Sequence, residues 1–136
     1  MDVADGGKVT MTADEKVVVN TEIIADTISV ESKKDIVIKK DIKAQGGDVT
    51  LKADSDKDGV GSFTQEAEVI STTGAGNIKV DGSGVMTLRT LETQNGSIKV
   101  GTEVTPTSIA GTPKYVHTAG DVEIVGSRES GAGGVS

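Results

Sequence analysis

The 136-residue chain has no cysteine and no tryptophan, and Phe63 and Tyr115 are its only aromatic residues. Without cysteine, neither a disulfide framework nor a thiolate metal site can form. The single histidine, His117, cannot supply a two-histidine metal site within one chain. With so few aromatic rings, the core must be built from aliphatic side chains.

Charge of one sign is also scarce, since 14 basic residues face 21 acidic ones and the formal net charge is −7. Such a chain should repel nucleic acid and anionic lipid surfaces, so we expect no nucleic-acid partner. No apolar stretch approaches the roughly 18 residues that span a bilayer, and we expect no membrane insertion. Met1 is followed by Asp2 and Asp5, where a signal peptide would carry positive charge, so we expect a segment of a longer protein.

The chain is rich in glycine, with 18 residues, and several of them open a short repeat. The unit is glycine, a polar residue, Val or Ile, another polar residue and a second aliphatic residue. Because apolar and polar residues alternate, each unit predicts a strand with one buried face. The copies begin at Gly7, Gly47, Gly76, Gly96 and Gly120, with a sixth, at residues 26–30, that lacks the glycine.

The spacing of these units is nearly regular. Their central Val or Ile residues stand at positions 9, 28, 49, 78, 98 and 122, which are separated by 19, 21, 29, 20 and 24 residues. The basic period is about 20 residues, and the acidic, glycine-rich residues 54–62 match the excess of 29 over 20 as an inserted loop. Pro106 and Pro113 fall in the last long interval, where they predict a looser connection because proline cannot donate to a central ladder.

Two further apolar positions follow about 8 and about 14 residues after the central residue of a unit. Three short strands in so few residues cannot bury their own inward side chains, so neighbouring periods must stack. We therefore predict a single all-β domain over residues 1–136, folded as a right-handed parallel β-helix (β-solenoid) of about 20 residues per coil. Its predicted irregular parts are the insertion loop 54–62 and a flexible tail at 127–136.

The alternative fold is an antiparallel β-sandwich. Asn95-Gly96, between Leu91 and Ile98, is typical of the type I′ turn of a hairpin. The repeated period favours the solenoid, because a sandwich has no reason to repeat its loop lengths.

Three of the repeat units carry a resemblance to a known family. Gly47–Ala53, Gly74–Val80 and Asn95–Val100 are similar to the repeats of filamentous haemagglutinin-like large exoproteins. The resemblance covers about residues 6–126. It implies a right-handed β-helix, a place outside the cell or on the bacterial cell surface, and adhesion to a cell-surface glycan or receptor. A β-helical middle segment can equally act as a spacer that holds a binding tip away from the cell.

The sharpest local motif is Asp54-Ser55-Asp56-Lys57-Asp58-Gly59, with three carboxylates at alternate positions and a glycine for the turn. Calcium takes six to eight oxygen ligands, and this spacing opens a typical calcium loop. We therefore predict calcium as a cofactor held by Asp54, Asp56 and Asp58, with the Val60 carbonyl as a further ligand. A solvated acidic loop is the alternative, because Gln65 stands where a helix–loop–helix site carries a bidentate Glu.

These features favour a non-enzymatic structural or adhesive segment. Because both end coils of a solenoid would expose unpaired strand edges, we also expect end-to-end self-association into filaments. A calcium-dependent binding module and a polysaccharide-active β-helix enzyme are the alternatives. The exposed strand positions mix charges without forming a carboxylate pair, which disfavours the enzyme.

Overall fold

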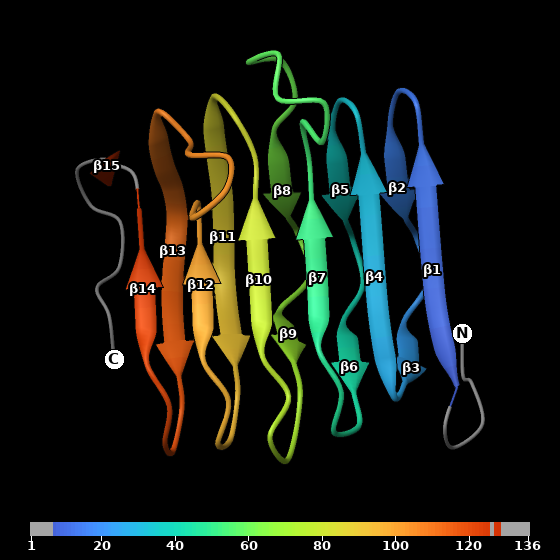
Figure 1. Ribbon diagram of the computed structural model, residues 1–136, viewed down its shortest axis with the longest axis vertical. Helices are drawn as coiled ribbons and strands as arrows, with labels where there is room; N and C mark the ends of the chain where they lie inside the picture. The colour runs from blue at the N-terminus through green and yellow to red at the C-terminus, as the bar shows by residue number, and fades with distance from the viewer. Residues whose placement is uncertain (1–6, 126, 129–136) are drawn as a thin grey trace.

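The structure is a computed structural model that describes residues 7–125 and 127–128 (Figure 1). These residues form strands, turns and loops, and no helix occurs among them. The strands are β1 (Lys8–Ala13), β2 (Val17–Val19), β3 (Ile23–Ala25), β4 (Thr27–Ser32), β5 (Ile36–Ile38), β6 (Ile42–Ala44), β7 (Val49–Lys52), β8 (Phe63–Gln65), β9 (Val69–Ser71), β10 (Ile78–Asp81), β11 (Val85–Glu92), β12 (Ile98–Val100), β13 (Ser108–Val116), β14 (Val122–Ile124) and β15 (Ser127–Arg128).

The strands stack into two facing sheets, and the strand pairs of the described residues are parallel (Figure 1). The front sheet has the order β1-β4-β7-β10-β12-β14, one strand from each coil. In Figure 1 the chain climbs the front sheet, descends the back sheet and advances by one strand per coil, which is a right-handed path. The β-solenoid prediction is therefore confirmed, and the antiparallel sandwich is wrong.

The repeat units form one column across the front sheet. Val49 pairs with Ile28 on one side and with Ile78 on the other, and Ile78 pairs in turn with Ile98. All four side chains are 0% exposed. Fully burying a Val or Ile side chain contributes about 1.5–3 kcal/mol, so this column is a main source of stability. The predicted column is confirmed.

The back sheet changes along the solenoid. In the first three coils, two short strands share this face, such as β5 and β6. The eight-residue strand β11 then pairs with both β8 and β9, and β13 pairs with β11. The prediction of three short strands per coil is therefore wrong from β11 onward, because Arg89 and Thr90 continue the strand without a turn.

The insertion loop 54–62 widens one corner of the third coil. Ile28 precedes Ile36 by 8 residues, whereas Val49 precedes Phe63 by 14, although Val49 pairs with Ile28 and Phe63 with Ile36. The loop thus inserts 6 residues (14 − 8), and the rest of this coil's excess is spread over its other two corners.

Pro113 lies inside β13 and not in a loose connection, which corrects the expectation from the sequence. The pairing of β11 with β13 shifts between Leu88↔Gly111 and Thr90↔Lys114, so two residues of β13 lie opposite Arg89. This β-bulge leaves one residue outside the regular ladder, and a proline there removes no required donor.

Asn95 and Gly96 form a coil corner and not a hairpin. Neither residue has the positive φ that a type I′ turn requires at both central positions. A Cβ added to Gly96 would lie 1.8 Å from the carbonyl oxygen of Gly76, so glycine here permits close stacking of two coils.

The last strand, β15, pairs with β13 and lies within the range 127–136 that the sequence predicted as a flexible tail. For its two residues that prediction is wrong, because they continue the ladder. Residues 129–136 lie outside the described residues. In register, Arg128 takes the position next to Ile109. No helix in the described part of the chain is long and apolar enough to cross a membrane.

Candidate functional site

The acidic loop of residues 54–62 joins β7 to β8 at one end of the strands (green in Figure 1). The N–H of Asp54 donates to the carbonyl oxygen of Lys34 at 3.0 Å, in the coil before. Near its other end, the Gly61 carbonyl accepts the N–H of Ser83 at 2.7 Å, in the coil after. The insertion is therefore attached to both neighbouring coils.

Asp54 shapes this loop from the inside. Its side chain is only 1% exposed, and its Oδ1 and Oδ2 atoms accept the N–H groups of Asp58 and Gly59, each at 3.0 Å. Oδ2 also accepts the hydroxyl of Ser83. Burial by itself raises the pKa of Asp54, but the hydrogen bonds from Ser83, Asp58 and Gly59 outweigh it and hold the pKa below its usual value.

The loop brings the three predicted carboxylates together. Asp56 and Asp58 are exposed, and one oxygen from each, with one from Asp54, lie within 4.8 Å of one another. Partial desolvation raises the pKa of Asp56, and the neighbouring Asp54 and Asp58 raise it further. A divalent cation would relieve this repulsion, and carboxylate oxygens are the ligands that calcium prefers.

Val60 lies two residues beyond Asp58, with its side chain 57% exposed and its N–H donating to Asp58 Oδ1 at 2.9 Å. Three carboxylates and one carbonyl would leave calcium in need of further oxygens, which water can supply. Both oxygens of Asp54 already accept hydrogen bonds within the fold, so its first role is to organise the loop. Calcium binding stays a prediction.

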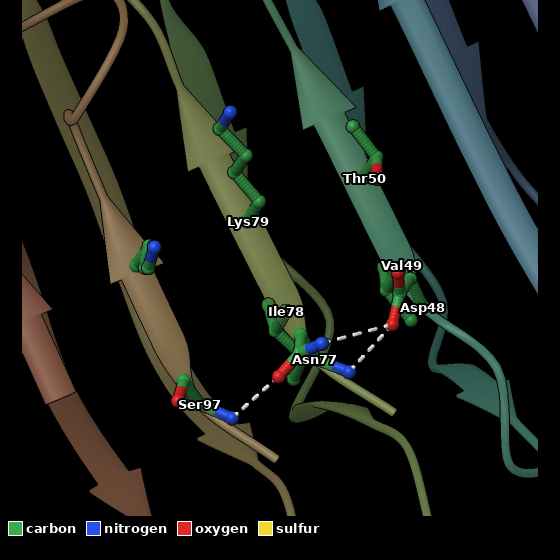
Figure 2. A pocket seen from close by; sticks show the side chains of 8 residues that line it. Asp48, Val49, Thr50, Asn77, Ile78, Lys79 and Ser97 are labelled. Atoms are coloured by element: carbon green, nitrogen blue, oxygen red, sulfur yellow. Dashed lines mark hydrogen bonds between the residues drawn. The ribbon is translucent and has the colours of Figure 1, made fainter. Parts of the chain in front are cut away.

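A polar ladder on the outer face of the front sheet was not predicted from the sequence (Figure 2). Asp48 Oδ1 accepts the backbone N–H of Asn77 at 2.9 Å and its side-chain amide at 3.2 Å. Asn77 Oδ1 accepts the N–H of Ser97 at 2.7 Å, and Ser97 Oγ accepts the N–H of Asp121 at 3.2 Å. Each side chain thus binds the backbone of the next coil.

The sequence did contain a signal for this ladder. Each of these residues directly follows the glycine of a repeat unit, and each has a short side chain with an acceptor oxygen. The ladder borders a shallow hollow of about 280 Å³, whose outward-pointing lining includes Thr50, Lys79 and Lys99. Hydroxyl, amide and ammonium groups of this kind can hydrogen-bond to a polar ligand such as a sugar.

Asp81, at the end of β10, is a second feature that sequence reasoning missed. Its side chain is 1% exposed, and Oδ1 accepts the N–H groups of Glu103 and Val104 at 2.9 and 3.1 Å. Its Oδ2 atom is buried without a hydrogen-bond partner among the described residues. Burial raises the pKa of Asp81, and the Val104 hydrogen bond and the charges of Lys79 and Lys52 only partly oppose this.

Glu103 completes this cluster, because its carboxylate forms ion pairs with Lys52 at 3.6 Å and with Lys79. The loop that carries Glu103 covers an outward-facing strand position and so buries Asp81. Nothing in the repeat pattern indicates this burial, because the loop is specific to one coil.

The basic residues between 33 and 43 also form ion pairs along the solenoid. Lys33 lies 3.5 Å from Asp14, and Lys43 lies 3.3 Å from Glu22, each pair joining the second coil to the first. Exposed pairs of this kind contribute at most about 1 kcal/mol. Two of the lysines are thus matched by carboxylates of the neighbouring coil.

The chain matches no protein-family model, no curated protein and no solved structure. Its function is therefore argued from the residues and the fold alone.

Proposed function

We propose that this chain is a non-enzymatic structural segment of a secreted or cell-surface bacterial protein, in which the solenoid acts as a rigid rod with an adhesive outer face. The observation that carries this proposal is the single inward column through Val49, Ile78 and Ile98, kept in register by parallel ladders. Its similarity to haemagglutinin-like repeats supports the same function.

The rod resists bending and unfolding because neighbouring coils are joined in several ways. The backbone ladder links each coil to the next, as in the bond from the Ile78 N–H to the Ser97 carbonyl at 3.0 Å. The polar ladder from Asp48 to Asp121 adds bonds on the outside of the same sheet. In a solenoid each coil contacts only its neighbours, so stability grows with every added interface.

The adhesive role would lie on the outer face of the front sheet. The hollow beside Asn77 combines the Thr50 hydroxyl with the ammonium groups of Lys79 and Lys99 (Figure 2). Such groups suit a cell-surface glycan, and an acidic glycan above all, since Lys99 is exposed. A Lys99→Ala variant should then bind acidic glycans more weakly than the wild type on a glycan array.

Two experiments test the structural function. Held between two marker domains in a single-molecule pulling experiment, the chain should resist extension and then lose its coils cooperatively. Extension at low force without a measurable transition would contradict the rod. The purified chain should also leave acidic and neutral polysaccharides intact, whereas turnover that grows with enzyme concentration would favour the polysaccharide-active alternative.

A calcium-dependent binding module is the second candidate function. It is favoured by the convergence of carboxylate oxygens from Asp54, Asp56 and Asp58 within 4.8 Å. In this case calcium would stiffen the exposed half of the insertion loop and thereby order a binding surface beside the rod. Glycan or receptor binding that requires calcium would separate this candidate from a calcium-independent rod.

A further inference from the structure

We propose that β14 of one molecule pairs with β1 of a second copy of this chain, with Asp121 opposite Lys8, so that the solenoid continues in register across the contact. This inference rests on the proposed structural function and names the partner, the strands and the residues of the assembly. It is carried by three independent features of the first and last coils.

The first feature is an apolar surface at each end of the column. The inward residues of the inner coils are 0% exposed, as at Ile28 and Ile98, whereas their counterparts at the ends are only partly buried. These partly buried residues are Met11 and Val17 in the first coil and Val122 and Ile124 in the last. Stacking Val122 on Val9 and Ile124 on Met11 would remove this apolar surface from water.

The second feature is the direction of the polar ladder. In every step the side chain of one coil accepts the backbone N–H of the coil that follows, from Asp48 through Asn77 and Ser97 to Asp121. Asp121 is the last residue of this ladder in the described part of the chain, and its exposed carboxylate faces the side on which a further coil would lie. A second copy would present the N–H of Lys8 at this position.

The third feature is charge. Lys8 occupies the position after glycine in the first unit, so the ammonium group of one copy would lie beside the carboxylate of Asp121 of the other. Opposite charges side by side in neighbouring strands are favourable, and like charges are not. Gly7 precedes Lys8 as Gly120 precedes Asp121, so the second copy also has glycine at the corner where Gly96 closely approaches the Gly76 carbonyl.

The same pattern assigns the backbone bonds of the contact. Within the molecule, the N–H of Ile98 donates to the carbonyl of Asp121 at 2.9 Å. One coil later, the N–H of Val122 would donate to the Lys8 carbonyl of the second copy. Because the two surfaces differ, this contact is heterologous, and its repetition produces an open fibre and not a closed ring.

Charge reversal tests the contact. In Lys8→Asp two carboxylates would meet at the contact, and in Asp121→Lys two ammonium groups would meet. Each variant should raise the concentration needed for self-association in sedimentation velocity by about tenfold or more. An equimolar mixture of the two variants should assemble again into alternating fibres, because each variant then meets the opposite charge at both ends.

Control variants carry the same charge changes away from the ends. Lys40→Asp and Glu68→Lys alter exposed residues at coil corners of the back sheet, and both should assemble like the wild type. If the end variants assemble as readily as these controls, or if their mixture does not assemble, the proposed contact is wrong. Circular dichroism of every variant establishes that the β-solenoid is still folded.

Zero-length carbodiimide cross-linking gives a test on the unaltered chain. Lys8 and Asp121 lie at opposite ends of the front sheet, five strand spacings or roughly 24 Å apart, so an amide between them must join two copies. We expect this cross-link in the mass spectrum of the assembled fraction. A wild type that stays monomeric at high concentration but remains a folded rod overturns the docking alone. Loss of the rod in solution scattering would overturn the proposed function itself.

Discussion

The hydroxyl of Ser83 donates a hydrogen bond to the buried carboxylate of Asp54, 29 residues earlier in the chain. This bond attaches the acidic insertion to the following coil and stabilises the ionised form of Asp54. The insertion therefore has a rigid base, formed by Asp54, and an exposed half that carries Asp56 and Asp58.

Removing this bond should weaken the fold and change its response to acid. Ser83→Ala should lower the free energy of unfolding by about 1–3 kcal/mol at pH 7, because a buried charged acceptor loses a partner. The folded pKa of Asp54 is depressed, so its stabilisation is present above pH 3.8 and is lost as the pH falls through the folded pKa. Urea unfolding between pH 7 and pH 2 should show a smaller acid loss in the variant. Ser55→Ala, in the same loop, is the control and should resemble the wild type.

The inward column should be sensitive to the loss of a single side chain. Ile78→Ala should reduce the free energy of unfolding by about 2–5 kcal/mol, because Ile78 is 0% exposed and packs between two coils. Val85→Ala is the matched control, since Val85 is 47% exposed, and should change it by only about 0.5 kcal/mol. Equal effects of the two variants in thermal unfolding would contradict the register.

Calcium should bind to the exposed half of the acidic loop. Isothermal titration of the wild type should show one site per chain, and Asp56→Asn should weaken it by about tenfold or more because a charged ligand is lost. At a calcium concentration about 100 times the dissociation constant, the stability gain should be about 2.7 kcal/mol. Glu68→Gln serves as the control for net charge. The same calcium response in Asp56→Asn and the wild type would reduce the loop to a solvated insertion.

Calcium binding should also depend on pH. Asp56 has a raised pKa, so protons compete with calcium at a higher pH than for an ordinary aspartate. Affinity should fall as the pH drops towards this raised pKa, and bound calcium should lower the pKa of Asp56. Carbon-13 chemical shifts of the Asp56 carboxylate, followed with and without calcium, measure both effects, and an unshifted titration would contradict them.

The buried Asp81 should oppose folding when it is charged. Its folded pKa is raised, so the native state binds its proton more tightly than the unfolded state, and this residue adds stability as the pH falls through that pKa towards 3.8. The charges of Lys52, Lys79, Lys57 and Glu103 surround it, and none of the lysines pairs with Oδ2. Asp81→Asn should therefore lose this stabilisation by acid while keeping the acceptor for the Glu103 and Val104 N–H groups.

The measurement is the difference in unfolding free energy between Asp81→Asn and the wild type across pH 7 to pH 4. Asp26→Asn is the control for the loss of one carboxylate, because Asp26 lies in a coil corner where the carboxylate is not enclosed by a covering loop. A difference that does not change with pH would mean that burial does not govern Asp81.

Much of the architecture follows from the sequence because a stacked parallel ladder requires the same residue type at the same place in every coil. Val49, Ile78 and Ile98 could be assigned to one column from their position in the repeat unit, and the structure pairs them in that order. The convergence of Asp54, Asp56 and Asp58 also follows from local spacing, since a curled loop turns alternate residues towards one centre.

Other features depend on which distant segments become neighbours, and local pattern is blind to them. The bulge at Pro113 arises from the length of β11 beside it, and the merging of two short strands into β11 depends on a corner that lacks turn residues. The polar ladder through Asn77 becomes visible only once the coils are stacked.

By itself, then, the sequence determined the period, the inward column and the place of the insertion, because these are repeated or local properties of the chain. Only the tertiary structure decided that Asp54 is buried against Ser83, that Asp81 is enclosed by the loop carrying Glu103, and that Asp121 stands at the end of a ladder. The physical reason is that burial and hydrogen bonding of a polar group depend on the neighbouring coil, whose contribution differs from one turn of the solenoid to the next.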